Sequence, residues 1–78
     1  MDRDHFARIF GYEDYDAMQE NTTTVYKDGQ ICWNITSLPD NRFITWDNAE
    51  IADDRVEVFL TRESALNYLK QLRENILH

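Results

Sequence analysis

Hydrophobic residues change their spacing several times along this chain of 78 residues, and each change predicts an element. Residues 2–10 carry apolar side chains at helical spacing, and Gly11 is placed to end that helix in a left-handed conformation. Residues 13–20 predict a second, short helix, with Asp14 as its N-cap and Met18 turned inward. The N-terminal part of the chain is therefore expected to be helical.

The clearest local pattern is a β-hairpin over residues 22–36. Two runs of β-branched and aromatic residues flank Asp28-Gly29. This dipeptide is typical of a type I′ turn, in which both central residues have positive φ. Residues 22–27 and 30–36 are therefore expected to form a pair of antiparallel strands.

Two further strands follow the hairpin. Residues 42–46 are rich in β-branched and aromatic side chains. Residues 55–60 alternate so that Val56, Val58 and Leu60 share one face, which we expect to be the core face. The sheet is therefore predicted to have three to four strands.

The strongest helical pattern in the chain begins at Thr61, which suits the N-cap position, with Glu63 in the first turn. Apolar residues then recur at intervals of three and four: Ala65, Leu66, Leu69, Leu72 and Ile76. Such a stripe indicates a helix that packs one face on the sheet.

Together these elements predict an α+β fold in a single domain over residues 1–78. The fold is a small antiparallel sheet with an N-terminal helix, or two short helices, and a C-terminal helix packed on it. We expect the C-terminal helix to cover one face. The other face would carry Cys32, Phe43 and Phe59, and we expect the N-terminal helix rather than a partner protein to cover it.

The charge is strongly acidic and unevenly distributed. The chain has 15 acids and 8 bases, a net charge of −7. Residues 11–61 hold eleven acids against three bases, a net −8, whereas residues 1–10 are neutral and residues 62–78 sum to +1. This balance argues against direct binding of nucleic acid or of anionic membranes, which require a basic surface.

An acidic surface of this kind suits a basic protein partner, because carboxylates can occupy the positions of phosphates. The candidate partner-binding residues are Tyr12, Asp14, Tyr15, Asp16, Glu20, Asp47, Glu50, Asp53, Asp54 and Glu57. Two alternatives stay open. The acids could serve solubility alone, and the tyrosines could pack the N-terminal helix onto the sheet.

No motif for catalysis or for a cofactor is present. His5 and His78 lie far apart and Cys32 has no spaced partner, so no zinc pattern exists. The acidic loop over residues 47–54 lacks the central glycine and closing glutamate of an EF-hand. We therefore expect a protein that is not an enzyme and needs no metal or cofactor.

In kind, the chain resembles the small acidic inhibitors that phages encode against host defence, including anti-CRISPR proteins and DNA mimics. The features that carry the resemblance are the chain length, the acidic segment 11–61, the Asp28-Gly29 hairpin and the terminal helix Thr61–Leu77. The resemblance implies inhibition of a nucleic-acid-handling protein, such as a CRISPR-Cas complex or a nuclease, by steric blocking or by mimicry of nucleic acid.

The expected location is the cytoplasm, that of the host cell if a phage encodes the chain. The N-terminus has no basic region followed by an apolar stretch, and a single cysteine cannot form an internal disulfide. An alternative function is a small interaction or immunity-type module, monomeric or homodimeric. Such a module would bind its partner through the Phe43/Phe59 face of the sheet or through a side of the C-terminal helix.

Overall fold

The computed structural model describes residues 2–49 and 56–76, and it has the predicted α+β fold. The elements are α1 (Arg3–Ile9), α2 (Tyr15–Gln19), β1 (Thr22–Asp28), β2 (Ile31–Ser37), β3 (Phe43–Asp47), β4 (Glu57–Phe59) and α3 (Arg62–Ile76). The strands form one antiparallel sheet in the order β1-β2-β3-β4. Among the described helices, none is both long and apolar enough to cross a membrane.

The two N-terminal helices form as predicted and are joined by specific hydrogen bonds. Gly11 follows α1 with a φ of +96°, the left-handed geometry expected of a residue that ends a helix. The Asp14 carboxylate accepts a hydrogen bond of 2.8 Å from the backbone N–H of Ala17, which caps α2. The Asp4 carboxylate accepts from the N–H of Tyr15 at 3.0 Å and so ties α1 to α2.

The hairpin forms where it was predicted, but its turn is of a different kind. Asp28 pairs with Ile31, so the turn consists of Gly29 and Gln30. Only Gly29, with a φ of +64°, has a positive φ there. Positive φ at the first central residue alone is typical of a type II′ turn, so the prediction of a type I′ turn was wrong. In the next turn Asn41 takes the left-handed conformation, with a φ of +71°.

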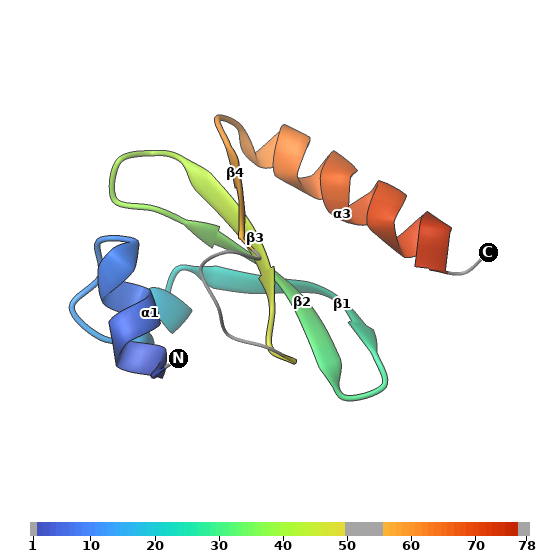
Figure 1. The fold of residues 1–78 in the computed structure, drawn as a ribbon. Helices are drawn as coiled ribbons and strands as arrows, with labels where there is room; N and C mark the ends of the chain where they lie inside the picture. Colours follow the sequence, from blue (N-terminus) through green and yellow to red (C-terminus); the bar gives the residue numbers. More distant parts are fainter. Residues whose placement is uncertain (1, 50–55, 77–78) are drawn as a thin grey trace.

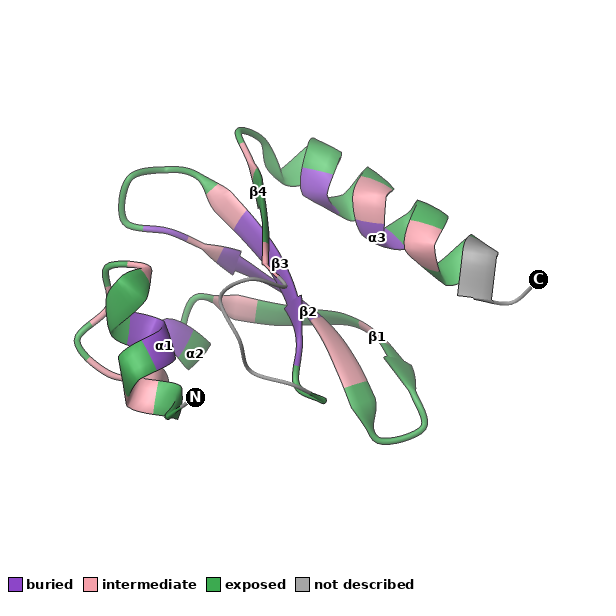
Figure 2. Ribbon diagram, in the orientation of Figure 1, coloured by how far each residue is buried: buried purple, intermediate pink, exposed green. Residues whose placement is uncertain are grey.

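One face of the sheet packs against α1 and α2 (Figures 1 and 2). The buried residues there are Phe6, Ala7, Met18, Leu38, Ile44 and Trp46. Phe6 lies 5.3 Å from Trp46 between ring centroids. The indole Nε1–H of Trp46 donates to the hydroxyl of Thr36 at 2.9 Å, so the one polar atom of this buried ring is paired.

The opposite face packs against α3, whose buried residues Ala65 and Leu69 contact Ile35 of the sheet. Phe59 and Tyr68 add an aromatic contact with ring centroids 5.3 Å apart. The hydroxyl of Thr61 accepts from the N–H of Ser64 at 3.1 Å, which confirms Thr61 as the cap of α3. The sheet is thus covered on both faces, as expected.

Two predictions about the faces were wrong. Phe43 pairs with Phe59 beneath α3, and not beneath the N-terminal helix. Val58 instead lies on the α1 side and stays 48% exposed, and Leu60, beyond the end of β4, is 81% exposed. The cause is that four of the five residues from Val56 to Leu60 are apolar, so alternation alone does not define which face is buried.

Candidate functional site

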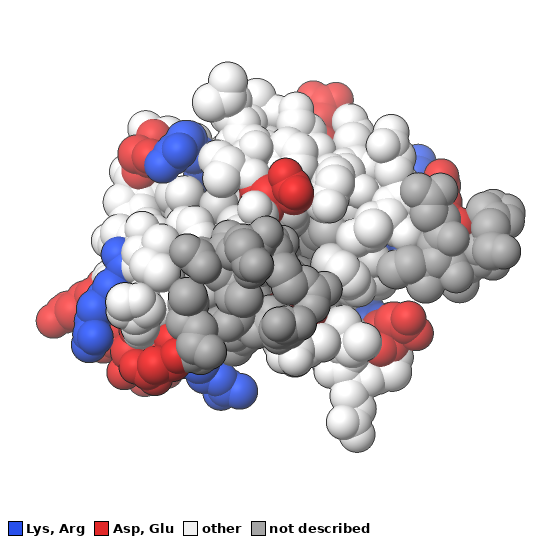
Figure 3. Space-filling model, in the orientation of Figure 1, with Lys and Arg blue, Asp and Glu red and all other residues white. Residues whose placement is uncertain are grey.

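The predicted acidic residues of the N-terminal region gather on and around α2. We call the predicted residues Asp14, Asp16 and Glu20, together with their neighbour Glu13, the acidic end. Glu13, Asp16 and Glu20 are exposed, whereas Asp14 is half-buried at its capping position. Figure 3 shows acidic atoms gathered over α1 and α2, with basic atoms beside them. Three of the four side chains of the acidic end therefore lie on the surface of the fold.

Asp16 alone lies in the first turn of α2, where negative charge is favoured, but its pairing with Glu20 works against helix stability. They are four residues apart, and side chains at that spacing are neighbours on one helix face. Two like charges there destabilise a helix by about 0.2–0.5 kcal/mol. Glu20 is also the C-cap of α2, the end of a helix at which negative charge is disfavoured.

The arginines of α1 do not neutralise these carboxylates. The Arg8 Nε–H donates to the backbone carbonyl oxygen of Glu13 at 3.2 Å. The guanidinium of Arg3 lies 5.3 Å from the centre of the Tyr15 ring. Within residues 2–49 and 56–76, the ion pair that forms is the one between Arg42 and Asp40, at 2.6 Å. The carboxylates of Asp16 and Glu20 are thus left facing solvent.

The two candidate tyrosines are half-buried and pack against the core below α1 and α2. The Tyr12 hydroxyl donates to the backbone carbonyl oxygen of Ser37 on β2, and burial raises the pKa of Tyr12 above its usual value. The Tyr15 ring packs edge-on to Trp46 with centroids 6.2 Å apart. These contacts match the packing alternative, and a contact of the outer ring edges with a partner stays a prediction.

Of the second predicted acidic cluster, Asp47 and Glu57 lie within the described residues. Asp47 and Glu57 lie on the α3 side of the sheet, opposite Trp33 and Thr45 respectively. Asp47 is only 4% exposed, and its carboxylate accepts from the N–H of Ala49 at 3.0 Å, whereas Glu57 is exposed. The other predicted members, Glu50, Asp53 and Asp54, lie outside the described residues. Asp47 therefore does not present its carboxylate to a partner in this conformation.

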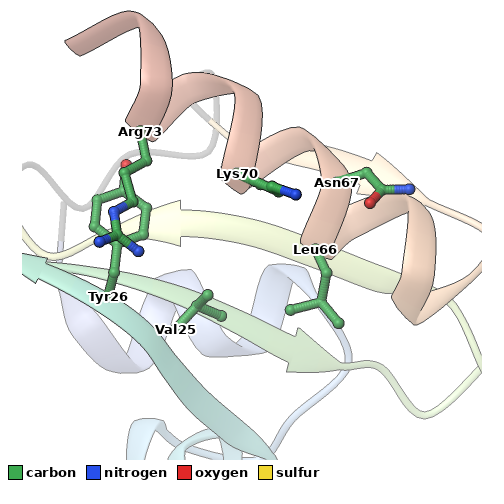
Figure 4. A pocket seen from close by; sticks show the side chains of 6 residues that line it. All are labelled: Val25, Tyr26, Leu66, Asn67, Lys70 and Arg73. Atoms are coloured by element: carbon green, nitrogen blue, oxygen red, sulfur yellow. The ribbon is translucent and has the colours of Figure 1, made fainter. Parts of the chain in front are cut away.

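A concave site that was not predicted lies between β1 and α3. We call it the β1–α3 pocket; it has a volume of about 310 Å³ and is lined by Val25, Tyr26, Leu66, Asn67, Lys70 and Arg73 (Figure 4). Lys70 and Arg73 lie toward the C-terminal end of α3, where cations are favoured in any helix, so their presence in the sequence does not point to a pocket. No sequence signal indicated that Val25 and Tyr26 would face them.

An irregularity in β1 builds the strand side of this pocket. Thr24 pairs with Asn34 and Tyr26 pairs with Trp33, so Val25 is an extra residue in the ladder. Such a bulge changes the face of the sheet to which the following side chains point. Consecutive strand residues normally point to opposite faces. Here the bulge lets Val25 and Tyr26 both line the pocket beneath α3.

No group of three or more metal-ligating side chains was found among the described residues. Cys32 is a free, half-buried thiol on β2, and its backbone N–H donates to the side chain of Asn48 at 2.7 Å.

Comparisons of the chain with protein-family models, with curated proteins and with solved structures found no match.

Proposed function

We propose that this chain is a non-enzymatic inhibitor that binds a basic, nucleic-acid-handling protein through its acidic end. The observation that carries the proposal is the pair Asp16 and Glu20, two exposed carboxylates on one face of α2 without an ion-pair partner in the described residues. Like the phage-encoded inhibitors it resembles in kind, the protein would act by occupying a groove that otherwise holds nucleic acid, in a CRISPR-Cas complex or a nuclease.

The rigidity of α2 supports this role. Met18 is fully buried, Asp14 caps the helix, and the Thr22 hydroxyl donates to the carbonyl oxygen of Met18 at 2.8 Å. A carboxylate on an element held at both ends loses little conformational freedom when a partner binds. The acidic end therefore resembles a prepared surface more than a mobile acidic tail.

The electrostatic cost of the acidic end also supports a binding role. Solubility requires only a net charge, which can be distributed anywhere on the surface. Asp16 and Glu20 instead lie side by side, and Glu20 lies at the wrong end of its helix. Arg and Lys side chains of a partner would relieve this repulsion and would make charge-assisted hydrogen bonds with the carboxylates.

The alternative is an interaction module with an apolar interface, and the Phe43/Phe59 face first suggested for it is covered. Phe43 and Phe59 pack beneath α3, so a partner would have to bind elsewhere. A side of α3 remains as the predicted surface for that alternative. Size-exclusion chromatography separates the two proposals, since a homodimer that persists in high salt favours the apolar module.

The test of the proposed function is capture of binding proteins from a host lysate by the immobilised chain. We expect the wild type to retain a basic nucleic-acid-binding protein, and the double variant Asp16→Lys/Glu20→Lys to lose it. Competition with duplex DNA should release the captured protein, because both ligands would occupy one basic groove.

The matched control is Glu63→Lys/Glu74→Lys, which changes two exposed acids of α3. Both double variants raise the net charge from −7 by the same amount. The control variant should retain the partner. Equal loss in both variants would mean that only the overall charge matters, and equal retention in both would contradict a role for the acidic end.

A further inference from the structure

The β1–α3 pocket has the opposite charge to the chain as a whole. Lys70 and Arg73 are the charged groups among its lining residues, in a chain of net charge −7. They lie three residues apart, so they are neighbours on the surface of α3. Asp28 and Asp47 act electrostatically on the Tyr26 ring, but neither lines the pocket. In Figure 4 the Lys70 side chain extends toward Asn67 and the Arg73 guanidinium lies over the Tyr26 ring, so the side chains must turn for one anion to contact both. Two cations beside a cavity favour an anion there.

The hydroxyl of Tyr26 is a buried donor without a hydrogen-bond partner among the described residues. Its ring stacks on Trp33 with centroids 5.9 Å apart, and the guanidinium of Arg73 lies 5.8 Å from the ring centre. Figure 4 shows the Arg73 side chain lying over the ring. Because buried hydroxyls almost always have a partner, this one is available to donate to a water or to a ligand in the pocket.

Burial, the largest cause, and the nearby Asp28 carboxylate raise the pKa of Tyr26, although Arg73 opposes this. The hydroxyl therefore keeps its proton at neutral pH and can donate a hydrogen bond to an acceptor. An anionic oxygen in the pocket would be such an acceptor.

The remaining wall of the pocket is apolar. Val25 is 36% exposed and Leu66 is 37% exposed. In Figure 4 the Val25 side chain points from the strand toward the helix, and Leu66 points from the helix toward the strand. Apolar side chains that face one another without filling the space between them leave surface that an apolar ligand can cover. The volume of about 310 Å³ lies at the lower end of the range for small-molecule sites.

We propose that the β1–α3 pocket binds a small organic acid, a carboxylate carried on an apolar body. The carboxylate lies between Lys70 and Arg73, and the planar guanidinium can hold both of its oxygens. When Arg73 moves from the Tyr26 ring onto the carboxylate, the hydroxyl is uncovered and donates to the same group. The apolar body covers Val25 and Leu66. This site is separate from the acidic end and does not depend on the proposed function.

The test is a titration of the ¹⁵N-labelled chain with hexanoate, followed by amide chemical shifts. We expect saturable shifts at the pocket residues of β1 and α3. Hexanol, which has the same chain without the charge, should bind at least about tenfold more weakly, since it lacks the charge-assisted hydrogen bonds. Inorganic phosphate, which lacks the apolar body, should also bind more weakly than hexanoate. Hexanol or phosphate binding as tightly as hexanoate would overturn the proposal, as would an absence of saturable shifts.

Three variants test the assigned roles. Arg73→Gln should weaken hexanoate binding about tenfold, whereas Arg62→Gln, the same change in the first turn of α3, should leave it unchanged. Tyr26→Phe should weaken binding about fivefold without lowering the stability of the fold, because it removes a hydroxyl that has no partner. Unchanged affinity in both Arg73→Gln and Tyr26→Phe would overturn the proposal. The variant Asp16→Lys/Glu20→Lys should bind hexanoate like the wild type, so a failure here is distinguishable from a failure of the acidic end.

Discussion

At the scale of single residues, Asp14 combines a structural role with a proposed binding role, and two substitutions separate them. Its carboxylate caps α2 through the N–H of Ala17. Asp14→Ala should lower the free energy of unfolding by about 0.5–2 kcal/mol, the usual cost of losing an N-cap. Asp14→Asn keeps an acceptor and should stay close to wild type in stability. Urea denaturation measures both values, and an unaffected Asp14→Ala would refute the capping role.

Tyr12 should make stability depend on alkaline pH. Burial raises the pKa of Tyr12 in the folded state above the ordinary 10.0. Above pH 10.0 the unfolded chain therefore loses this proton before the folded chain does, and the free energy of unfolding falls as the pH rises. Below that pH this contribution is constant.

The matching variant is Tyr12→Phe, which cannot titrate at this position. At neutral pH it should be less stable than wild type by about 0.5–1.5 kcal/mol, because it loses the hydrogen bond to Ser37. The difference in the free energy of unfolding between the wild type and Tyr12→Phe should narrow as the pH rises above 10.0, because only the wild type loses stability through ionisation of Tyr12. Denaturation at several pH values measures it, and a constant difference would contradict the account.

At the scale of elements, two leucines of α3 belong to the same apolar stripe in the sequence but differ in burial in the structure. Leu69 is fully buried against Ile35, whereas Leu66 is 37% exposed at the β1–α3 pocket. Leu69→Ala should cost about 2–5 kcal/mol, the usual range for a buried leucine. Leu66→Ala should cost much less. Thermal or urea unfolding of the pair tests this, and equal losses would mean that Leu66 is packed as tightly as Leu69.

Local chemistry made most of the elements predictable. Gly11 ends a helix because it lacks a side chain and reaches a positive φ, and Asp14 and Thr61 begin helices because their side chains cap them. The apolar stripe of α3 follows from its spacing. The turn after β1 lies one residue later than predicted, at Gly29-Gln30 instead of Asp28-Gly29. Both pairs place a glycine in a tight turn, so the sequence did not distinguish them. Phe59 was assigned to the wrong face because four of the five residues from Val56 to Leu60 are apolar, and Phe43, its partner in the sheet, was assigned to the same face.

The candidate sites were less predictable than the elements. The acidic end is contiguous in sequence, so its position on one short helix could be predicted from the run of acids. Asp47 belonged to an equally acidic segment, yet its burial depends on packing that no local pattern encodes. The β1–α3 pocket depends on the bulge at Val25, because without it Tyr26 would point to the opposite face.

At the scale of the whole molecule, a chain of net charge −7 carries both an acidic end and a small pocket lined by two cations. The helices α1 and α2, which carry the acidic end, lie on one side of the sheet, and α3, which lines the pocket, lies on the other (Figure 1). The two proposals thus assign a partner-binding surface and a ligand site with opposite charge preferences to one small fold. The sheet between them keeps the two sites physically apart.

The measurement that tests the central claim most directly is the salt dependence of the affinity for a captured basic partner. We predict that the affinity of the wild type falls steadily as salt rises to moderate ionic strength, because contacts between exposed charges are screened. Asp16→Lys/Glu20→Lys should bind far more weakly, while Glu63→Lys/Glu74→Lys keeps both the affinity and the salt dependence. An affinity that is insensitive to moderate salt, or unaffected by reversal of Asp16 and Glu20, would contradict the account.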